Sequence, residues 1–122
     1  MSIYINDELK QFQLNAGSSS YVMNVFGGYL MHLYWGNTLP EGDHSYMAGM
    51  FGRSSFEACE EGAWYSPNTI RQEFPCTGGA GVRKTAIEVI NADGSDIVDL
   101  RYDSYRLHAG KPRIEGLPAT YT

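Results

Sequence analysis

The chain has 122 residues and a formal net charge of -5 at pH 7, with 14 acidic against 9 basic side chains. This length fits one domain with one hydrophobic core and is too short for two separate domains. The acidic balance would repel a phosphate backbone, so it argues against a nucleic-acid partner. The sequence shows no apolar run near its start that would predict a signal peptide, and none long enough to predict a membrane helix. We therefore expect a cytoplasmic chain without a membrane partner, whose two cysteines, Cys59 and Cys76, stay free thiols.

Strand-like alternation dominates the first third of the chain. The run KQFQLNA at 10–16 alternates apolar with polar side chains, which predicts a half-buried strand. Two runs rich in aromatic and β-branched residues, at 20–26 and 29–35, flank Gly27 and Gly28. This glycine pair suits a tight turn that needs positive φ, so the two runs are predicted to form a hairpin.

The segment 36–84 interrupts the alternation. It is far longer than the ~12 to 15 residues beyond which an unstructured connection is unusual. A disordered linker is poor in large apolar side chains, whereas this segment carries Tyr46, Met50, Phe51, Phe56, Trp64, Tyr65 and Phe74. We therefore expect the segment to pack on a surface, either of its own domain or of another subunit.

A second hairpin is predicted over 86–102. Apolar residues recur on both sides of the turn signal Asp93-Gly94, at Ile87, Val89, Ile97, Val98 and Leu100. No window shows a convincing helical stripe with a cap and a stop. The sequence therefore predicts an all-β fold, and strands joined by hairpins that bury one face against a second layer form an antiparallel β-sandwich.

No complete catalytic site can be recognised from the residue types. Glu57, Glu60 and Glu61 cluster as a general acid/base pair would, but a solvated loop face is the simpler interpretation. The three histidines and two cysteines show no metal-ligand spacing, so neither a metal nor a cofactor is predicted. The run GRSSF lacks the second glycine of a nucleophile elbow, and TGGAGVRK lacks the Gly-Lys spacing of a phosphate loop.

Arg53, Phe56 and Trp64 remain as candidate substrate-binding residues. Aromatic side chains beside an arginine can stack on sugar rings and hydrogen-bond to hydroxyls, and the same residue types also anchor protein interfaces. Plain core packing is a third possibility. The residue types alone leave all three open.

The closing run RYDSYRLHAGKPRIEGLPATY resembles the amino-terminal domain of glycoside hydrolase family 36 α-galactosidases, the melibiases. The runs SIYINDELKQFQLNAGSSSYVM and GYLMHLYWG resemble the first strands of that domain, and SPNTIRQEFP keeps its Gln72, Glu73 and Pro75. The resemblance implies a β-supersandwich in which residues 1–122 form an N-terminal domain fragment without the catalytic barrel. The parent enzyme would hydrolyse terminal α-galactosides with retention, using two aspartates that fall outside these residues.

The resemblance also implies a homo-oligomer, often a tetramer, in which a loop of this domain approaches the active site of a neighbouring subunit. Arg53 and Phe56 are the nearest equivalents of that loop, whereas Gly52 and Glu57 depart from its pattern. In the run GAGVRK, Arg83 matches the family, whereas Gly81 and Val82 do not. Two alternatives remain: a free-standing carbohydrate-binding module, and a purely structural packing domain.

Overall fold

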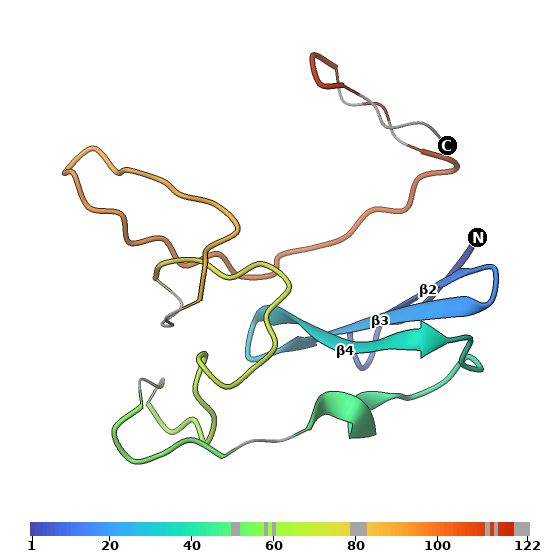
Figure 1. Cartoon of the computed structure of the whole chain (residues 1–122), viewed down its shortest axis with the longest axis horizontal. Helices are drawn as coiled ribbons and strands as arrows, with labels where there is room; N and C mark the ends of the chain where they lie inside the picture. The colour runs from blue at the N-terminus through green and yellow to red at the C-terminus, as the bar shows by residue number, and fades with distance from the viewer. Residues whose placement is uncertain are drawn as a thin grey trace.

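The computed structural model describes residues 1–49, 52–57, 59, 61–78, 83–111, 113 and 115–118. Four antiparallel strands form one sheet in chain order (Figure 1): β1 (Ser2–Asn6), β2 (Gln11–Ala16), β3 (Ser19–Phe26) and β4 (Tyr29–Asn37). Within the described residues the only helical element is the 3-10 turn η1 (Ser45–Ala48). The all-β, antiparallel prediction is confirmed. No helix in the described part of the chain has the length and apolarity to cross a bilayer.

The first predicted hairpin forms as β3 and β4. Phe26 pairs with Tyr29, which leaves Gly27 and Gly28 as a two-residue turn. Their φ angles of 58° and 81° are the positive values that a turn of this kind needs and that glycine adopts at little cost. The strand predicted at 10–16 is β2, which pairs with β3 on the other side.

The core lies on one face of this sheet. Its buried members are Val22, Tyr29, Met31, Leu33 and Ile70. Ile70 belongs to the long segment 36–84, and the backbones of Arg71 and Glu73 hydrogen-bond to the outer edge of β4 at 2.8 Å. This part of the segment therefore has the packing surface that its composition predicted, and the surface belongs to its own domain.

Two fully buried glutamines fasten a second part of the long segment, residues 39–44, which we call the strap. Gln13 Nε2 donates to the carbonyl oxygen of Leu39 at 3.0 Å, and Gln11 Oε1 accepts from the backbone N–H of His44 at 2.9 Å. Buried amides that are paired in this way avoid the cost of an orphaned polar group. The strap is thereby tied across β2.

The prediction of strands over 86–102 is wrong. The turn itself forms, because Asn91 N donates to Ser95 O at 2.8 Å and Gly94 has a φ of 84°. The arms contain no strand, although residues 83–111 are described without a gap. Ile97 in one arm is 68% exposed, and a two-stranded hairpin without a buried face is marginal in water. Figure 1 shows the turn and its two arms, which we call the excursion, extending away from the sheet. The described strands all belong to one sheet, so the described residues form one sheet layer.

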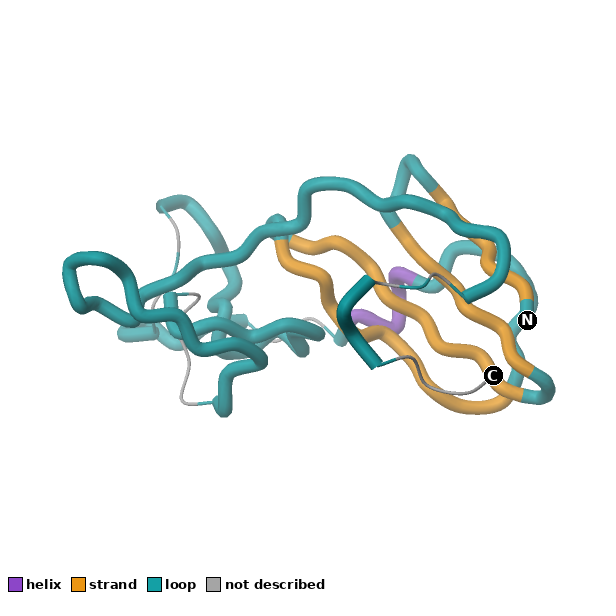
Figure 2. Tube along the Cα trace, turned by 90° about the horizontal axis from the view of Figure 1, so that it is seen from above, coloured by secondary structure: helices purple, strands orange, loops and turns teal. Residues whose placement is uncertain are grey.

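The chain then returns along the face of the sheet opposite η1, as Figures 1 and 2 show, whereas Ala48 of η1 packs against the core. Tyr102 N donates to Gly28 O at 2.8 Å. The ring of Phe12, which the pairing register places on this second face, lies 6.1 Å from the Tyr102 ring and 5.2 Å from the Tyr105 ring. The returning chain therefore covers part of a face that the strands alone would leave open.

Candidate functional site

The candidate residues Arg53 and Trp64 meet at the base of one loop. The backbone N–H of Arg53 donates to the carbonyl oxygen of Trp64 at 3.4 Å, and Arg53 Nε donates to the carbonyl oxygen of Ala63 at 3.0 Å. These two bonds hold the ends of the intervening chain together. We call residues 52–64 the aromatic loop, of which 52–57, 59 and 61–64 are described.

Phe56 lies on a turn in the first half of the aromatic loop. Ser54 N donates to Glu57 Oε2 at 2.8 Å, and Glu57 N donates to Ser54 O at 3.2 Å. The two bonds close the turn reciprocally, much as a capping box closes the start of a helix. The Phe56 residue is 89% exposed, so the turn presents an aromatic ring to solvent.

The two described glutamates of this region, Glu57 and Glu61, lie in turns of the loop. Glu57 uses its carboxylate to close the turn, and Glu61 is exposed in a second turn. Glu60 lies outside the described residues. Because glycoside hydrolysis needs two carboxyl groups set across one bond, the commitment of Glu57 to its own backbone favours the solvated-loop interpretation.

Three aromatic rings join the aromatic loop to the end of β3. The Phe26 ring centroid lies 6.0 Å from that of Trp64 and 4.8 Å from that of Tyr65, both near edge-to-face. Such pairs contribute about 0.5 to 1.5 kcal/mol each beyond the burial of area. The Tyr65 ring also lies against Gly27, where an added Cβ would come within 2.6 Å of Tyr65 Cζ.

The structure thus brings Arg53 and Trp64 together and places Phe56 separately on its turn. Trp64 is 49% exposed, so it combines ring packing with an accessible surface. Arg53 is half-buried and, among the described residues, its terminal guanidinium nitrogens have no hydrogen-bond partner. This combination offers fork-like donors for hydroxyl groups and apolar faces for a ring, which are suited to binding a sugar.

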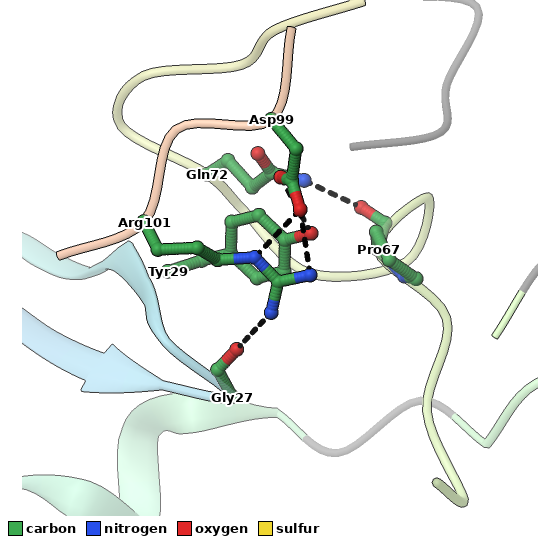
Figure 3. Close-up of polar contacts among 6 residues, drawn as sticks. All are labelled: Gly27, Tyr29, Pro67, Gln72, Asp99 and Arg101. Atoms are coloured by element: carbon green, nitrogen blue, oxygen red, sulfur yellow. Dashed lines mark hydrogen bonds and ion pairs between the residues drawn. The ribbon is translucent and has the colours of Figure 1, made fainter. Parts of the chain in front are cut away.

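A clamp at the tip of the β3–β4 hairpin was not predicted from the sequence (Figure 3). The Arg101 guanidinium lies 4.1 Å from the centroid of the Tyr29 ring, and Arg101 Nη1 donates to Gly27 O at 3.0 Å. Asp99 accepts from Arg101 Nε at 2.8 Å and from the Tyr29 hydroxyl at 3.0 Å. The clamp fixes the returning chain on the same turn that contacts Tyr65. Sequence spacing gives no signal for it, because Tyr29 and Asp99 are 70 positions apart.

A second arginine clamps the long segment onto itself. Arg83 donates through its guanidinium to the carbonyl oxygens of Asn68, at 2.6 Å, and Ile70. These bonds support the residues that carry Ile70 into the core. The position of the GAGVRK run that matches the family therefore has a structural role here.

A polar cluster lies on the other face of the sheet, around Glu73. Its carboxylate accepts from the Tyr21 hydroxyl and lies 3.3 Å from His32 Nδ1. Burial, followed by the hydrogen bond to Glu73 and by its charge, raises the pKa of Tyr21 to about 12. Tyr21 is therefore a neutral donor at pH 7. The described residues contain no group of three or more His, Cys, Asp and Glu side chains that could hold a metal ion.

The chain matches the sequence model of the glycosyl hydrolase family 36 N-terminal domain over residues 28–122. It belongs to this family. The family 36 domain is 40% identical to α-galactosidase AgaA of Geobacillus stearothermophilus over 133 residues, which cover 99% of this chain and 17% of AgaA. It is 33% identical to the bifunctional α-galactosidase/sucrose kinase AgaSK of Mediterraneibacter gnavus, over 99% of this chain and 13% of that protein.

Solved structures agree with the sequence matches. The crystal structure of the family 36 α-galactosidase AgaB of Geobacillus stearothermophilus superposes with a TM-score of 0.80 and 39% identity, covering 100% of this chain and 17% of that one. The galactosidase domain of AgaSK gives a TM-score of 0.86 at 32% identity, over 99% of this chain and 17% of that one. These matches confirm the family and the N-terminal domain fold that the sequence predicted. The family 36 domain thus spans about one sixth of the length of these relatives.

Proposed function

We propose that this family 36 domain is the non-catalytic N-terminal β domain of a longer, retaining α-galactosidase, and that its aromatic loop helps to close the sugar pocket of a neighbouring subunit. The relatives named as α-galactosidases match nearly the whole chain with a small part of their own length. AgaA variants have been crystallised with raffinose and with stachyose. The substrate class proposed for the parent of this chain is accordingly an α-galactoside.

Three carboxylates with structural partners support a non-catalytic role for this domain. Glu57 closes a turn, Glu73 pairs with Tyr21, and Asp99 holds Arg101. A carboxylate that is committed to structure is a poor nucleophile or proton donor for a bound sugar. The two carboxyl groups of a retaining mechanism, about 5 to 5.5 Å apart across the glycosidic bond, would come from the part of the parent beyond residues 1–122.

The base of the aromatic loop carries the proposal. Two hydrogen bonds fix Arg53 to the backbone of Ala63 and Trp64, so the guanidinium is held by its own Nε while its terminal nitrogens can donate elsewhere. The Phe56 ring projects from the same loop with 89% exposure. A hydrogen-bonded loop base with available donors and an exposed ring is suited to contacts outside its own domain.

The exposed apolar residues of the second half of the chain support a role in assembly. Ile90, Ile97 and Leu107 are 81%, 68% and 59% exposed. Where such side chains gather into a contiguous patch, they mark a region that another domain or subunit covers. We propose that the rest of the parent supplies the second layer of a sandwich and that the parent assembles as a cytoplasmic homo-oligomer, a tetramer.

The test is Arg53→Ala in the full-length enzyme. Because loss of a charge-assisted hydrogen bond typically costs about 1.5 to 3 kcal/mol, we expect kcat/KM for an aryl α-galactoside to fall roughly ten- to a hundredfold. Arg106→Ala removes an exposed arginine outside the aromatic loop and is the matched control. Unchanged kcat/KM for Arg53→Ala, with an intact oligomer, would reduce the aromatic loop to a packing element.

A further inference from the structure

We propose that Gly27 and the rings of Phe26 and Tyr65 form a seat that sets the direction in which the aromatic loop projects. Phe26 and Tyr65 would then be positioning residues for sugar binding, although they do not touch the sugar. The positioning of the loop is independent of what the loop binds, whereas the consequence for sugar binding rests on the proposed function.

The Tyr65 ring lies close to both Gly27 and Phe26 at the seat. A Cβ at Gly27 would be 2.6 Å from Tyr65 Cζ and 3.0 Å from Tyr65 Cε2, so any side chain there would displace the ring. The same ring packs near edge-to-face on Phe26, with centroids 4.8 Å apart. The hydroxyl end of the Tyr65 ring can therefore approach the hairpin tip because the glycine has no side chain.

A chain of short connections links the seat to the candidate residues. Trp64 follows Tyr65 directly in sequence, and its ring also packs on Phe26, at 6.0 Å between centroids. The carbonyl oxygen of Trp64 accepts from the backbone N–H of Arg53 at 3.4 Å. A displacement of Tyr65 would thus reach Trp64 through the chain and Arg53 through the hydrogen bond to the Trp64 carbonyl oxygen.

The sheet contains a matched control for the seat. Gly17, in the turn between β2 and β3, has the same φ as Gly27, 58°, but nothing lies within 4 Å of its Cβ position. Replacement of either glycine by alanine carries the same backbone strain of a positive φ. Only the replacement at Gly27 would also push a ring away.

The first measurement follows the aromatic loop itself. Cys59 is an exposed free thiol within that loop, whereas Cys76 is buried, so a nitroxide attached to Cys59 reports loop motion in the full-length enzyme once other reactive thiols are replaced. We expect Gly27→Ala and Tyr65→Ala to sharpen the electron paramagnetic resonance spectrum. Gly17→Ala leaves the seat intact and should give the spectrum of the unaltered protein. Tyr65→Phe keeps the ring but removes the hydroxyl beside Gly27, and its spectrum should stay closer to that of the unaltered protein than the Tyr65→Ala spectrum does. Identical spectra for Gly27→Ala and Gly17→Ala would contradict the proposal that the seat positions the aromatic loop.

The second measurement is kinetic and separates the two proposals. With an aryl α-galactoside, Gly27→Ala should raise KM roughly fivefold or more over Gly17→Ala, with a smaller change in kcat, because loop contacts serve binding. If the spectrum sharpens while kcat/KM is unchanged for both Gly27→Ala and Arg53→Ala, the seat is confirmed and the sugar-binding role is wrong. If Gly27→Ala does not fold, Tyr65→Ala gives the same comparison against Tyr65→Phe without altering the turn.

Discussion

At the scale of single residues, Tyr21 shows how one carboxylate changes the chemistry of a neighbour. Burial disfavours the phenolate, and the Glu73 carboxylate adds a hydrogen bond to the neutral hydroxyl and a negative charge beside it. All three effects raise the pKa of Tyr21, to about 12. We expect Glu73→Gln to lower that pKa toward the usual 10 without reaching it, because burial remains. Carbon NMR of the ring during a titration measures it, and an unaltered pKa would show that the two side chains do not meet.

The same shift makes stability depend on pH in the alkaline range. The folded pKa of Tyr21 is raised above the unfolded value of 10.0, so the stabilisation from the neutral hydroxyl is fully present below pH 10. It is lost as pH rises from about 10 to about 12. Tyr21→Phe has no proton to lose and should show a smaller fall in the urea midpoint over this range than the unaltered protein. Parallel curves for the two proteins would contradict the assignment.

At the scale of elements, the position of the strap is set by its polar contacts with β2 more than by the composition of the strap itself. Gln11 accepts from the backbone N–H of His44 at 2.9 Å, and its Nε2 donates to Gly42 O at 2.7 Å. Gln11→Met keeps the volume but leaves both backbone groups without these partners. A buried polar group without a partner costs roughly 1 to 3 kcal/mol, and the free energy of unfolding should fall by about that amount.

Amide hydrogen exchange locates this effect. The His44 amide should exchange faster in Gln11→Met, because the side-chain oxygen that accepts from it is gone. The Thr38 amide donates to Ser18 O at 2.9 Å, through the backbone alone, and serves as the internal control. Equal acceleration at both amides would indicate general destabilisation of the sheet and not release of the strap.

At the scale of the whole molecule, the 122-residue chain leaves much apolar surface open. The arms of the excursion after residue 83 expose isoleucines that no second layer covers in the described residues. We expect the chain by itself to self-associate or to bind an apolar dye such as anilinonaphthalene sulfonate, and the full-length parent to bind much less of it per domain. A dye-free monomer would favour the free-standing carbohydrate-binding module.

Hydrolysis is also a property of the whole molecule. We expect the isolated chain to release no aryl group from an α-galactoside, because the retaining mechanism requires a pair of carboxyl groups across one bond. In the aromatic loop, Glu57 uses its carboxylate to close a turn of its own backbone. Turnover that co-purifies with the chain and disappears in Glu57→Gln, Glu60→Gln or Glu61→Gln would contradict the non-catalytic assignment.

The candidate site was predictable only in part. Residue types nominated Arg53, Phe56 and Trp64, and the family resemblance singled out the first two of these. The fold brings Arg53 and Trp64 to one loop base through one backbone hydrogen bond, while Phe56 stands apart on a turn closed by Glu57. A backbone bond across eleven positions leaves no trace in residue types, so the pairing of Arg53 with Trp64 could not be read from the sequence.

Local rules were enough to determine β2, the β3–β4 hairpin and its two-glycine turn, because period-two alternation and positive φ are properties of neighbouring residues. The arms of the predicted second hairpin satisfy the same local rule and form no strand, since a strand also needs a layer to bury its apolar face. Whether a second layer covers a given segment is decided by the tertiary structure. It also decided the contacts of Tyr65 with Gly27 and of Arg101 with Tyr29, which join positions tens of residues apart and are specified by packing and not by any periodicity.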